Sequence, residues 1–405
     1  MLDMLFGECM AFVFIPLVFL GLYNLFNTEK NHYYLIIGTA GLIISHNITT
    51  MLTAIFAFLY LIINIKNIKS TRVKKGLLID VLFIVLLTSF YWMPFLETKM
   101  FTNYRVFEKD AMASKESVLA HRIDLKDLII TQNDTNLVLE VGLPVILMLA
   151  FSIMAFRQIK ENKKEYLFFA ISGIVSCFMS TKYFPWNWLP DCCYIIQFPW
   201  RMLVFSSFFF AIIASINMSV VIKKFNIKDV LIIGIILLIY IWSRYSVIQY
   251  SENVPKVEDY QILNVSGHNN EWLPGMGRLE YLPSKAYENT FYIATSQKGI
   301  LAVNGQCKIE EEVKLGSYLT AKISTEDEKA TLELPFIYYP GYTVRFDGII
   351  MDTFETENGF LGCTIEKNEN GKLEVKYTET TCMNISKIIS VVAGIIFIIY
   401  VWKKH

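Results

Sequence analysis

A long apolar run from Tyr33 to Asn64 is interrupted near its middle by the polar triplet Ser45-His46-Asn47. A membrane-spanning helix needs about 20 apolar residues, so this run is too long for one ordinary span. Adjacent polar side chains deep in hydrocarbon are costly, and such residues are functional candidates by default. A reversal at His46, with one helical arm on each side and the polar residues at the water boundary, accounts for both observations. The triplet therefore predicts a helical hairpin that turns at His46.

The composition of the whole chain is that of a membrane protein. Of its 405 residues, 54% are hydrophobic and 15% aromatic, which is more apolar than a typical soluble domain. The formal net charge is 0, so there is no general attraction to nucleic acid and no nucleic-acid partner is expected. The seven cysteines include no C-x-x-C pair and no zinc-site spacing.

Apolar stretches alternate with basic segments along the first 250 residues. If each apolar stretch crosses a bilayer and the chain turns at His46, the basic clusters at 66–75, 157–164, 223–228 and 403–404 all lie on one side. The positive-inside rule makes that side the cytoplasm. The sequence thus predicts a polytopic α-helical membrane protein with about nine spans, at 4–26, 33–44, 48–63, 77–95, 137–156, 166–179, 202–222, 230–245 and 385–402.

The composition changes between Ser251 and Thr381, where short alternating runs are separated by Gly, Pro and Asn. Such runs predict strands, here at 292–295, 317–323, 330–334, 342–346 and 373–377. We therefore expect a transmembrane helical domain at 1–250, an extracytoplasmic β-sandwich-like domain at 251–381, and a C-terminal transmembrane anchor at 382–405.

The predicted topology gathers ionisable residues at the outer membrane surface, among them Glu8, His46, Glu97 and Arg201. A cleft between them could hold a carboxylate base and a cation for phosphate. Each residue also has a plainer interpretation. Glu8 could pair with a neighbouring cation, His46 could cap the reversal, Arg201 could snorkel to the interface, and Glu97 could be a solvated loop charge. No P-loop, G-x-G-x-x-G, H-E-x-x-H or G-x-S-x-G motif is present, which argues against the common soluble chemistries.

Six short stretches, taken in order, are similar to those of a known group of proteins. They are Gly7-Glu8-Cys9-Met10-Ala11 continuing to Ile15-Pro16-Leu17-Val18; Ser45-His46-Asn47; Tyr91-Trp92-Met93-Pro94-Phe95-Leu96-Glu97; Phe198-Pro199-Trp200-Arg201; Glu280-Tyr281-Leu282-Pro283; and Leu334-Pro335-Phe336-Ile337-Tyr338-Tyr339-Pro340-Gly341-Tyr342 with Phe346-Asp347-Gly348. Through their order and spacing, almost the whole chain resembles the bacterial membrane proteins called 6-pyruvoyl-tetrahydropterin-synthase-related and the neighbouring YfhO-type proteins. That name implies no pterin chemistry in this sequence.

This group in turn resembles the GT-C class of membrane glycosyltransferases, which use a polyprenyl-phosphate sugar donor at the extracytoplasmic face, often with a divalent metal ion. The resemblance implies a multi-pass protein of the bacterial cytoplasmic membrane that builds cell-envelope glycan, with the bilayer and a lipid-linked sugar as partners. Glu8 and His46 would be catalytic, and Arg201 would meet the donor phosphate. Substrate would be bound by Asn47, Glu97, Trp200 and Arg201. The sequence does not identify metal ligands.

The chain departs from the GT-C class at its start. In those enzymes the catalytic acid typically lies in the first outer loop, and several spans precede the region matched here. This sequence begins just before Gly7-Glu8. The chain therefore resembles a C-terminal portion, and a separate N-terminal subunit carrying the main catalytic acid is an expected partner.

Two other functions fit the sequence. The first is a non-catalytic membrane protein whose β domain binds a glycan or a partner subunit; the stretch 336–339 would then stack on sugar, although its aromatic residues also suit core packing. The second is a transporter, which would need charged residues or broken helices near the midplane. Glu8, His46 and Arg201 fall near the ends of predicted spans, which ranks the transporter last. The sequence leaves open whether the chain is an enzyme.

Overall fold

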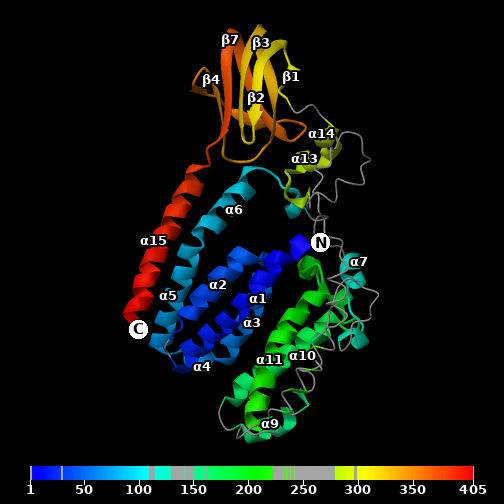
Figure 1. Ribbon diagram of the computed structural model, residues 1–405, viewed down its shortest axis with the longest axis vertical. Helices are drawn as coiled ribbons and strands as arrows, with labels where there is room; N and C mark the ends of the chain where they lie inside the picture. The colour runs from blue at the N-terminus through cyan, green and yellow to red at the C-terminus, as the bar shows by residue number, and fades with distance from the viewer. Residues whose placement is uncertain are drawn as a thin grey trace. The chain divides into compact units, whose positions relative to one another are not determined.

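The computed structural model describes residues 2–28, 31–108, 115–128, 141, 149–150, 152–159, 162–221, 231, 234–235, 238, 241, 279–295 and 299–404. Its internal contacts divide the chain into two compact units. The described residues of Met1–Val81 and Met112–Tyr260 form unit 1, and those of Leu82–Ala111 and Gln261–His405 form unit 2. Figure 1 labels the longer helices and strands of both units.

The regular elements of unit 1 are all helical in the part of the chain that the structure describes. Its first part comprises α1 (Leu2–Tyr23), the π-helical turn η1 (Asn24–Thr28), α2 (Tyr33–Ser45), α3 (Asn47–Ile63), α4 (Ile65–Ile68) and most of α5 (Thr71–Leu87). Its second part comprises α7 (Lys115–Ala120), η3 (Leu125–Leu128), α9 (Ser152–Gln158), α10 (Lys163–Ser180), η4 (Trp186–Trp188), η5 (Asp191–Ile196), η6 (Pro199–Arg201) and α11 (Met202–Val221).

Helices α1 and α2 pack antiparallel at very short range. A Cβ atom added to Gly21 of α1 would lie 2.1 Å from the main-chain nitrogen of Leu35, and one added to Gly38 of α2 would lie 2.6 Å from that of Val18. Small residues let helix backbones approach closely, which is a common way for apolar helices to associate. The two glycines therefore hold α1 and α2 together as one rigid pair.

The predicted break at His46 is confirmed. Helices α2 and α3 are separated by this single residue, whose backbone is extended at φ −158° and ψ 114°. Near the end of α3, the ring of Tyr60 lies 6.3 Å from that of Phe19 and 6.1 Å from that of Phe26. Phe19 lies near the end of α1 and Phe26 lies in η1, and α2 begins shortly after η1. The end of α3 has therefore returned to the place where α2 starts. The chain therefore reverses direction at His46.

An aromatic cluster fills the centre of unit 1 and joins its two parts. The ring of Phe19 from α1 lies 5.4 Å from that of Phe209 in α11, and the ring of Tyr60 lies 5.1 Å from that of Phe168 in α10. All four side chains are buried. Large aromatic side chains contribute much of the burial energy of a core, so this cluster fixes α1 and α3 against α10 and α11.

The prediction of about nine spans is wrong. Among the described residues, three helices are long and apolar enough to cross a membrane: Gly7–Thr28, Pro199–Val220 and Thr381–Lys403. The arms around His46 have only 13 and 17 residues, about 20 and 26 Å of helix, against a hydrocarbon thickness of about 30 Å. The predicted span 166–179 lies in α10, whose first turn carries three charged residues. The predicted spans 137–156 and 230–245 lie mostly outside the described residues.

The predicted span 77–95 is broken. Helix α5 ends at Leu87, and α6 (Ser89–Phe101) follows with a bend of 63° between the two helices. The pair is a fourth candidate membrane span only if both helices are counted as one span. The Thr88 hydroxyl at the break donates to the Ile84 carbonyl at 2.7 Å, a type of bond that bends helices. In unit 2, α6 packs along α15 (Thr381–Lys404), where the hydroxyls of Ser89 and Ser390 lie 2.8 Å apart.

The rest of unit 2 consists of one antiparallel sheet and of short helical segments that precede its strands in the sequence. The strands are β1 (Leu301–Asn304), β2 (Cys307–Leu315), β3 (Tyr318–Ile337), β4 (Tyr342–Phe346), β5 (Ile349–Ile350), β6 (Thr353–Glu355) and β7 (Phe360–Tyr377). Their order is β1-β3-β7-β4-β5, with β2 also paired to β3 and β6 to β7 (Figure 1). The helical segments are η2 (Arg105–Phe107), η8 (Leu279–Tyr281), α13 (Ser284–Glu288) and α14 (Thr290–Thr295).

The prediction of a β-sandwich-like domain is also wrong, because a single sheet curls into a half-barrel. Leu319 and Ile323 at one end of β3 share a core with Leu332 and Leu334 at the other end. The buried positions change from odd to even numbers across an irregular stretch of pairing with β7 between Thr325 and Lys329. Shifting the pleat by one residue turns the second half of the strand back toward the same core. The predicted strands 317–323 and 330–334 are thus both parts of β3, and 292–295 lies in helix α14.

Candidate functional site

A buried ion pair joins the first helix of unit 1 to the start of α11. Glu8 lies near the beginning of α1, and Arg201 ends the turn η6 that leads into α11. The Arg201 Nε atom donates to Glu8 Oε2 at 3.3 Å, and the two side chains are only 8% and 2% exposed. Charges removed from water this completely need partners of opposite charge. The pair predicted to line an outer cleft is therefore present as a contact.

The guanidinium of Arg201 is held on several sides. Its Nη1 atom donates to the Ile196 carbonyl and to Gln197 Oε1, both at 2.8 Å. Its carbon lies 4.9 Å from the ring centre of Phe198 and 5.9 Å from that of Trp200, within the range of a cation–π contact. Gln197 has a positive φ of 62°, which is uncommon for a residue other than glycine. Gln197 is a site residue that sequence reasoning missed, because no motif marks a turn of this kind.

The Glu8 carboxylate is only half satisfied. Its Oε2 atom accepts from Arg201, while Oε1 is buried and has no hydrogen-bond partner. Buried polar atoms nearly always have a partner, and an exception costs about 1–3 kcal/mol. One oxygen is thus oriented by a cation, and the other remains available to a proton, a water molecule or a substrate hydroxyl. This asymmetry is the most unusual feature of the site.

His46 stands close to this pair because α1 and α2 approach each other at their ends. A Cβ atom on Gly7 would lie 2.7 Å from the Ser45 main-chain oxygen. The Thr49 main-chain nitrogen donates to His46 Nδ1 at 3.3 Å. An amide N–H can only donate, so Nδ1 accepts and the neutral ring carries its proton on Nε2. Burial, and then the positive charge of Arg201, lower the pKa of His46, which lies outside the three candidate spans, to about 4.

The remaining predicted site residues fall in two places. Trp200 belongs to the Arg201 surroundings, and Asn47 is the exposed first residue of α3, next to His46. Glu97 belongs to unit 2, where the Thr380 hydroxyl donates to its Oε2 atom at 2.6 Å and so ties α6 to the start of α15. The structure therefore brings Glu8, His46, Trp200 and Arg201 together in unit 1, with Asn47 adjacent in sequence, and places Glu97 in unit 2.

A second buried pair in unit 1 was not predicted. His32 Nδ1 lies 2.9 Å from each carboxylate oxygen of Asp80, and the side chains are 6% and 0% exposed. His32 precedes α2, and Asp80 lies within α5. A lone aspartate in an apolar stretch is a signal that could have identified this pair, because intramembrane acids normally have a partner.

Among the residues that the structure describes, the surroundings of Glu8 do not offer the donor set of a metal site. Nowhere in the described part of the chain do three or more His, Cys, Asp or Glu side chains gather in a way that could hold a metal ion. Next to Glu8 there is one histidine ring, whose Nδ1 atom is bonded to Thr49, and one cationic guanidinium, which repels a metal ion.

Comparison with known proteins gives one match of low identity. No protein-family model matches the chain, and no solved structure matches it. It is similar to a protein of Lactococcus lactis subsp. cremoris (strain MG1363) described as an uncharacterized protein. The two are 23% identical over an alignment of 451 positions, which covers 98% of this chain and 72% of that protein. This similarity carries no activity over to the chain.

Proposed function

We propose that this chain is a membrane glycosyltransferase-like protein of the type that it resembles, and that it acts on a polyprenyl-phosphate-linked sugar. The observation that supports this proposal best is the Glu8 carboxylate, whose one oxygen is oriented by Arg201 while the other is buried without a partner. A positioned carboxylate with a free oxygen is the arrangement expected of a general base.

In the proposed reaction Glu8 activates the acceptor. The proton of an acceptor hydroxyl moves to Glu8 Oε1 as the acceptor oxygen forms a bond to the anomeric carbon of the donor sugar. The bond between that carbon and the phosphate oxygen breaks, and polyprenyl phosphate leaves with the electron pair. Arg201 positions Glu8 through Nε and places positive charge near the leaving phosphate. His46, neutral and protonated on Nε2, donates a hydrogen bond to a sugar hydroxyl.

The proposed location is the bacterial cytoplasmic membrane, which the chain crosses several times. Three apolar helices of the described chain could span a membrane. By the positive-inside rule the basic clusters at 66–75 and 403–404 face the cytoplasm, which leaves the β-sheet of unit 2 on the outside. Glu326 lies on the exposed bend of β3, and Lys69 lies between α4 and α5. In the proposed orientation Glu326 is outside the membrane and Lys69 is on the cytoplasmic side.

Cysteine labelling tests this topology. A membrane-impermeant maleimide added to intact cells should label a Glu326→Cys variant, whereas a Lys69→Cys variant should react only after the cells are permeabilised. Peptide mass spectrometry separates these positions from the native cysteines. Labelling of Lys69→Cys in intact cells, with Glu326→Cys protected, would reverse the proposed orientation.

Replacing Glu8 by glutamine tests the catalytic role. The amide keeps the size of the side chain and an oxygen that can accept from Arg201, but it cannot take up the acceptor proton. Turnover of a polyprenyl-phosphate-linked sugar by the full chain in proteoliposomes should fall by about 10²–10⁴-fold, the usual contribution of a general base. The release of polyprenyl phosphate measures the rate.

The matched control is Glu357→Gln, because the Glu357 carboxylate is 95% exposed and lies in unit 2. Its turnover should remain within about twofold of wild type, since surface substitutions rarely have larger effects. Wild-type turnover by the Glu8→Gln variant would refute the role of Glu8. An inactive wild-type chain would refute transferase activity by this chain alone.

A further inference from the structure

A cavity of about 270 Å³ lies in unit 2, where the chain leaving α6 meets the segment that leads into α13. It is lined by residues 102–104, Lys99, Phe107, Glu108 and Ser284. Main-chain bonds join its two walls. The Ser284 nitrogen donates to the Asn103 carbonyl at 2.8 Å, and the Arg105 nitrogen donates to the Leu282 carbonyl at 3.0 Å. The cavity is therefore built by paired backbone and does not depend on a single side chain.

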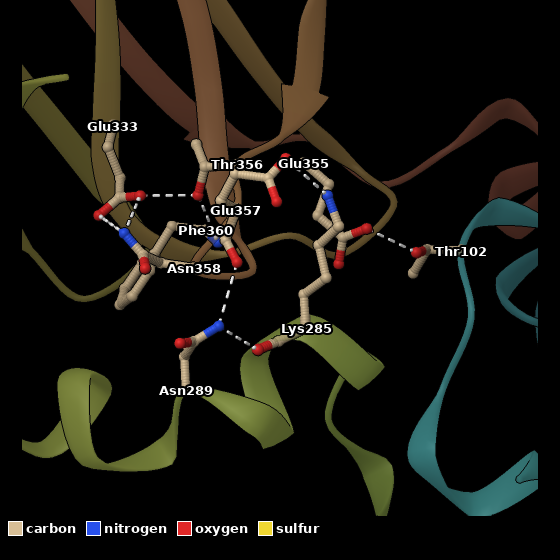
Figure 2. Close-up of polar contacts among 9 residues, drawn as sticks. All are labelled: Thr102, Lys285, Asn289, Glu333, Glu355, Thr356, Glu357, Asn358 and Phe360. Atoms are coloured by element: carbon tan, nitrogen blue, oxygen red, sulfur yellow. Dashed lines mark hydrogen bonds and ion pairs between the residues drawn. The ribbon is translucent and has the colours of Figure 1, made fainter. Parts of the chain in front are cut away.

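Three buried polar atoms of unit 2, two of them in residues that line this cavity, have no hydrogen-bond partner. They are the hydroxyl of Tyr104, the hydroxyl of Ser284 and the Oε1 atom of Glu355. Tyr104 and Ser284 line the cavity, and Tyr104 as a whole is only 4% exposed. Glu355 is linked to the cavity by Thr102, whose hydroxyl donates to Glu355 Oε2 at 2.9 Å (Figure 2). Each unpaired atom has a free-energy cost that a bound ligand would remove.

The neighbouring carboxylate of Glu333 shows how this unit normally treats a buried acid. Its oxygens accept from the hydroxyl of Tyr292 at 2.9 Å, from that of Thr356 at 2.7 Å and from the amide of Asn358 at 3.1 Å. Figure 2 shows the bonds from Thr356 and Asn358. Glu333 is thus fully satisfied within the protein, whereas the three unpaired atoms are not. This contrast indicates a ligand site.

The polar atoms are held rigidly by aromatic stacking. The ring of Tyr104 is stacked on that of Tyr339 at 6.0 Å, and Phe101 is stacked on Tyr338 at 4.7 Å. The two tyrosines that follow Ile337 therefore support the cavity. Phe107, which is 40% exposed, lines the cavity itself. An aromatic surface with a few fixed polar groups is typical of small-molecule sites.

The charges and the size define the class of ligand. The lining contains one cation, Lys99, and one acid, Glu108, which also pairs with Arg105. An anion such as phosphate is normally bound by several cations or a bidentate arginine, so this balance favours a neutral ligand. Sites for drug-sized molecules measure about 300–1,000 Å³, and this cavity is slightly smaller. Hydroxyl, amide and carboxylate groups beside one aromatic ring suit a polyhydroxylated molecule.

We propose that this cavity of unit 2 binds a single neutral sugar ring, through the hydroxyls of Tyr104 and Ser284, which belong to its lining. The sugar hydroxyls supply both donors and acceptors, and so satisfy the hydroxyls of Tyr104 and Ser284. Phe107 packs against the apolar face of the ring. This site rests on observations in unit 2 alone and does not depend on the proposed transfer reaction in unit 1.

Binding to the purified full chain tests the proposal. The detergent must lack a sugar head group, which would otherwise compete. The probes are N-acetylglucosamine, methyl glucoside and, for an anion site, inorganic phosphate, each titrated with detection by saturation-transfer NMR. We expect saturable binding of at least one sugar and none of phosphate. Tyr104→Phe and Ser284→Ala should each weaken sugar binding about tenfold, the effect of one lost hydrogen bond.

The thermal unfolding midpoint separates a ligand role from a structural one. Removing an unpaired buried hydroxyl should leave the midpoint of the free Tyr104→Phe variant unchanged or raised. Tyr342→Phe loses a hydroxyl elsewhere in unit 2 and should bind sugar as wild type does. Absence of sugar binding, binding of phosphate alone, or equal sugar affinity of wild type, Tyr104→Phe and Ser284→Ala would overturn the proposal.

Discussion

Replacing Arg201 with methionine should destabilise unit 1 by about 3–5 kcal/mol, the usual effect of removing one partner of a buried ion pair. Methionine replaces the apolar stem of the arginine side chain but leaves the Glu8 carboxylate buried without its cation. The Gln197 side chain and the Ile196 carbonyl lose their donor as well. Denaturant titration of the solubilised protein measures the loss. Hydrogen exchange of peptides from α1 and α11 should show that it is local to unit 1.

Two further variants make this prediction specific to charge. Glu8→Leu with Arg201→Met removes both charges, so the double variant should be more stable than Arg201→Met alone. Arg201→Lys keeps the charge but not the fork of donors, and it should fall between wild type and Arg201→Met. If the double variant were as unstable as the sum of both single variants, the ion pair would not be the cause.

Gly359→Ala should destabilise unit 2 by about 2–5 kcal/mol, since it combines a left-handed backbone with a steric clash. Gly359 has φ +79°, and a Cβ atom there would lie 2.3 Å from the main-chain nitrogen of Ala286 in α13. Its carbonyl also accepts from the Tyr338 nitrogen at 3.0 Å. Because the contact is with backbone, no side-chain rotation relieves it. Hydrogen exchange of β3 and β7 peptides, together with denaturant titration, reports the loss.

Gly348→Ala is the matched control for this substitution. Gly348 has φ +82°, yet nothing lies within 4 Å of the position that its Cβ atom would occupy. Its replacement should cost only the backbone strain of about 1–2 kcal/mol. The difference between the two alanine variants isolates the close approach of α13 to the turn before β7. Equal losses would show that this approach contributes nothing.

The sequence predicted the local features of unit 1 well. A polar triplet inside an apolar run was sufficient to locate the turn at His46, because hydrocarbon tolerates few unpaired polar groups. The ion pair of Glu8 with Arg201 matches the plainer interpretation of Glu8, that it pairs with a neighbouring cation. The number of spans was overestimated because apolar composition reports burial in lipid and burial in protein alike. Tyr60 and Phe168, for example, lie in predicted spans, but their side chains are buried in the protein core.

Other features could not be predicted because they depend on contacts between distant residues. Only one oxygen of Glu8 has a hydrogen-bond partner, and that partner, Arg201, lies 193 positions away in the sequence. Alternating residues revealed strand segments at 317–323 and 330–334, but not that the bend at 326–329 joins them into β3. The cavity of unit 2 combines residues near position 100 with Ser284, and no local pattern marks such a pairing.

The division of unit 2 along the chain has a consequence for biosynthesis. Helix α6 is anchored by Ser89, whose hydroxyl donates to the Ser386 carbonyl of α15, 297 residues later. At roughly 5–20 residues per second, a ribosome needs about 15–60 s to make the intervening chain. During that interval α6 exists without its permanent neighbour, while the residues from 112 onward are being synthesised. Completion of unit 2 is therefore a late event, and α6 requires a temporary partner, lipid or protein, until α15 arrives.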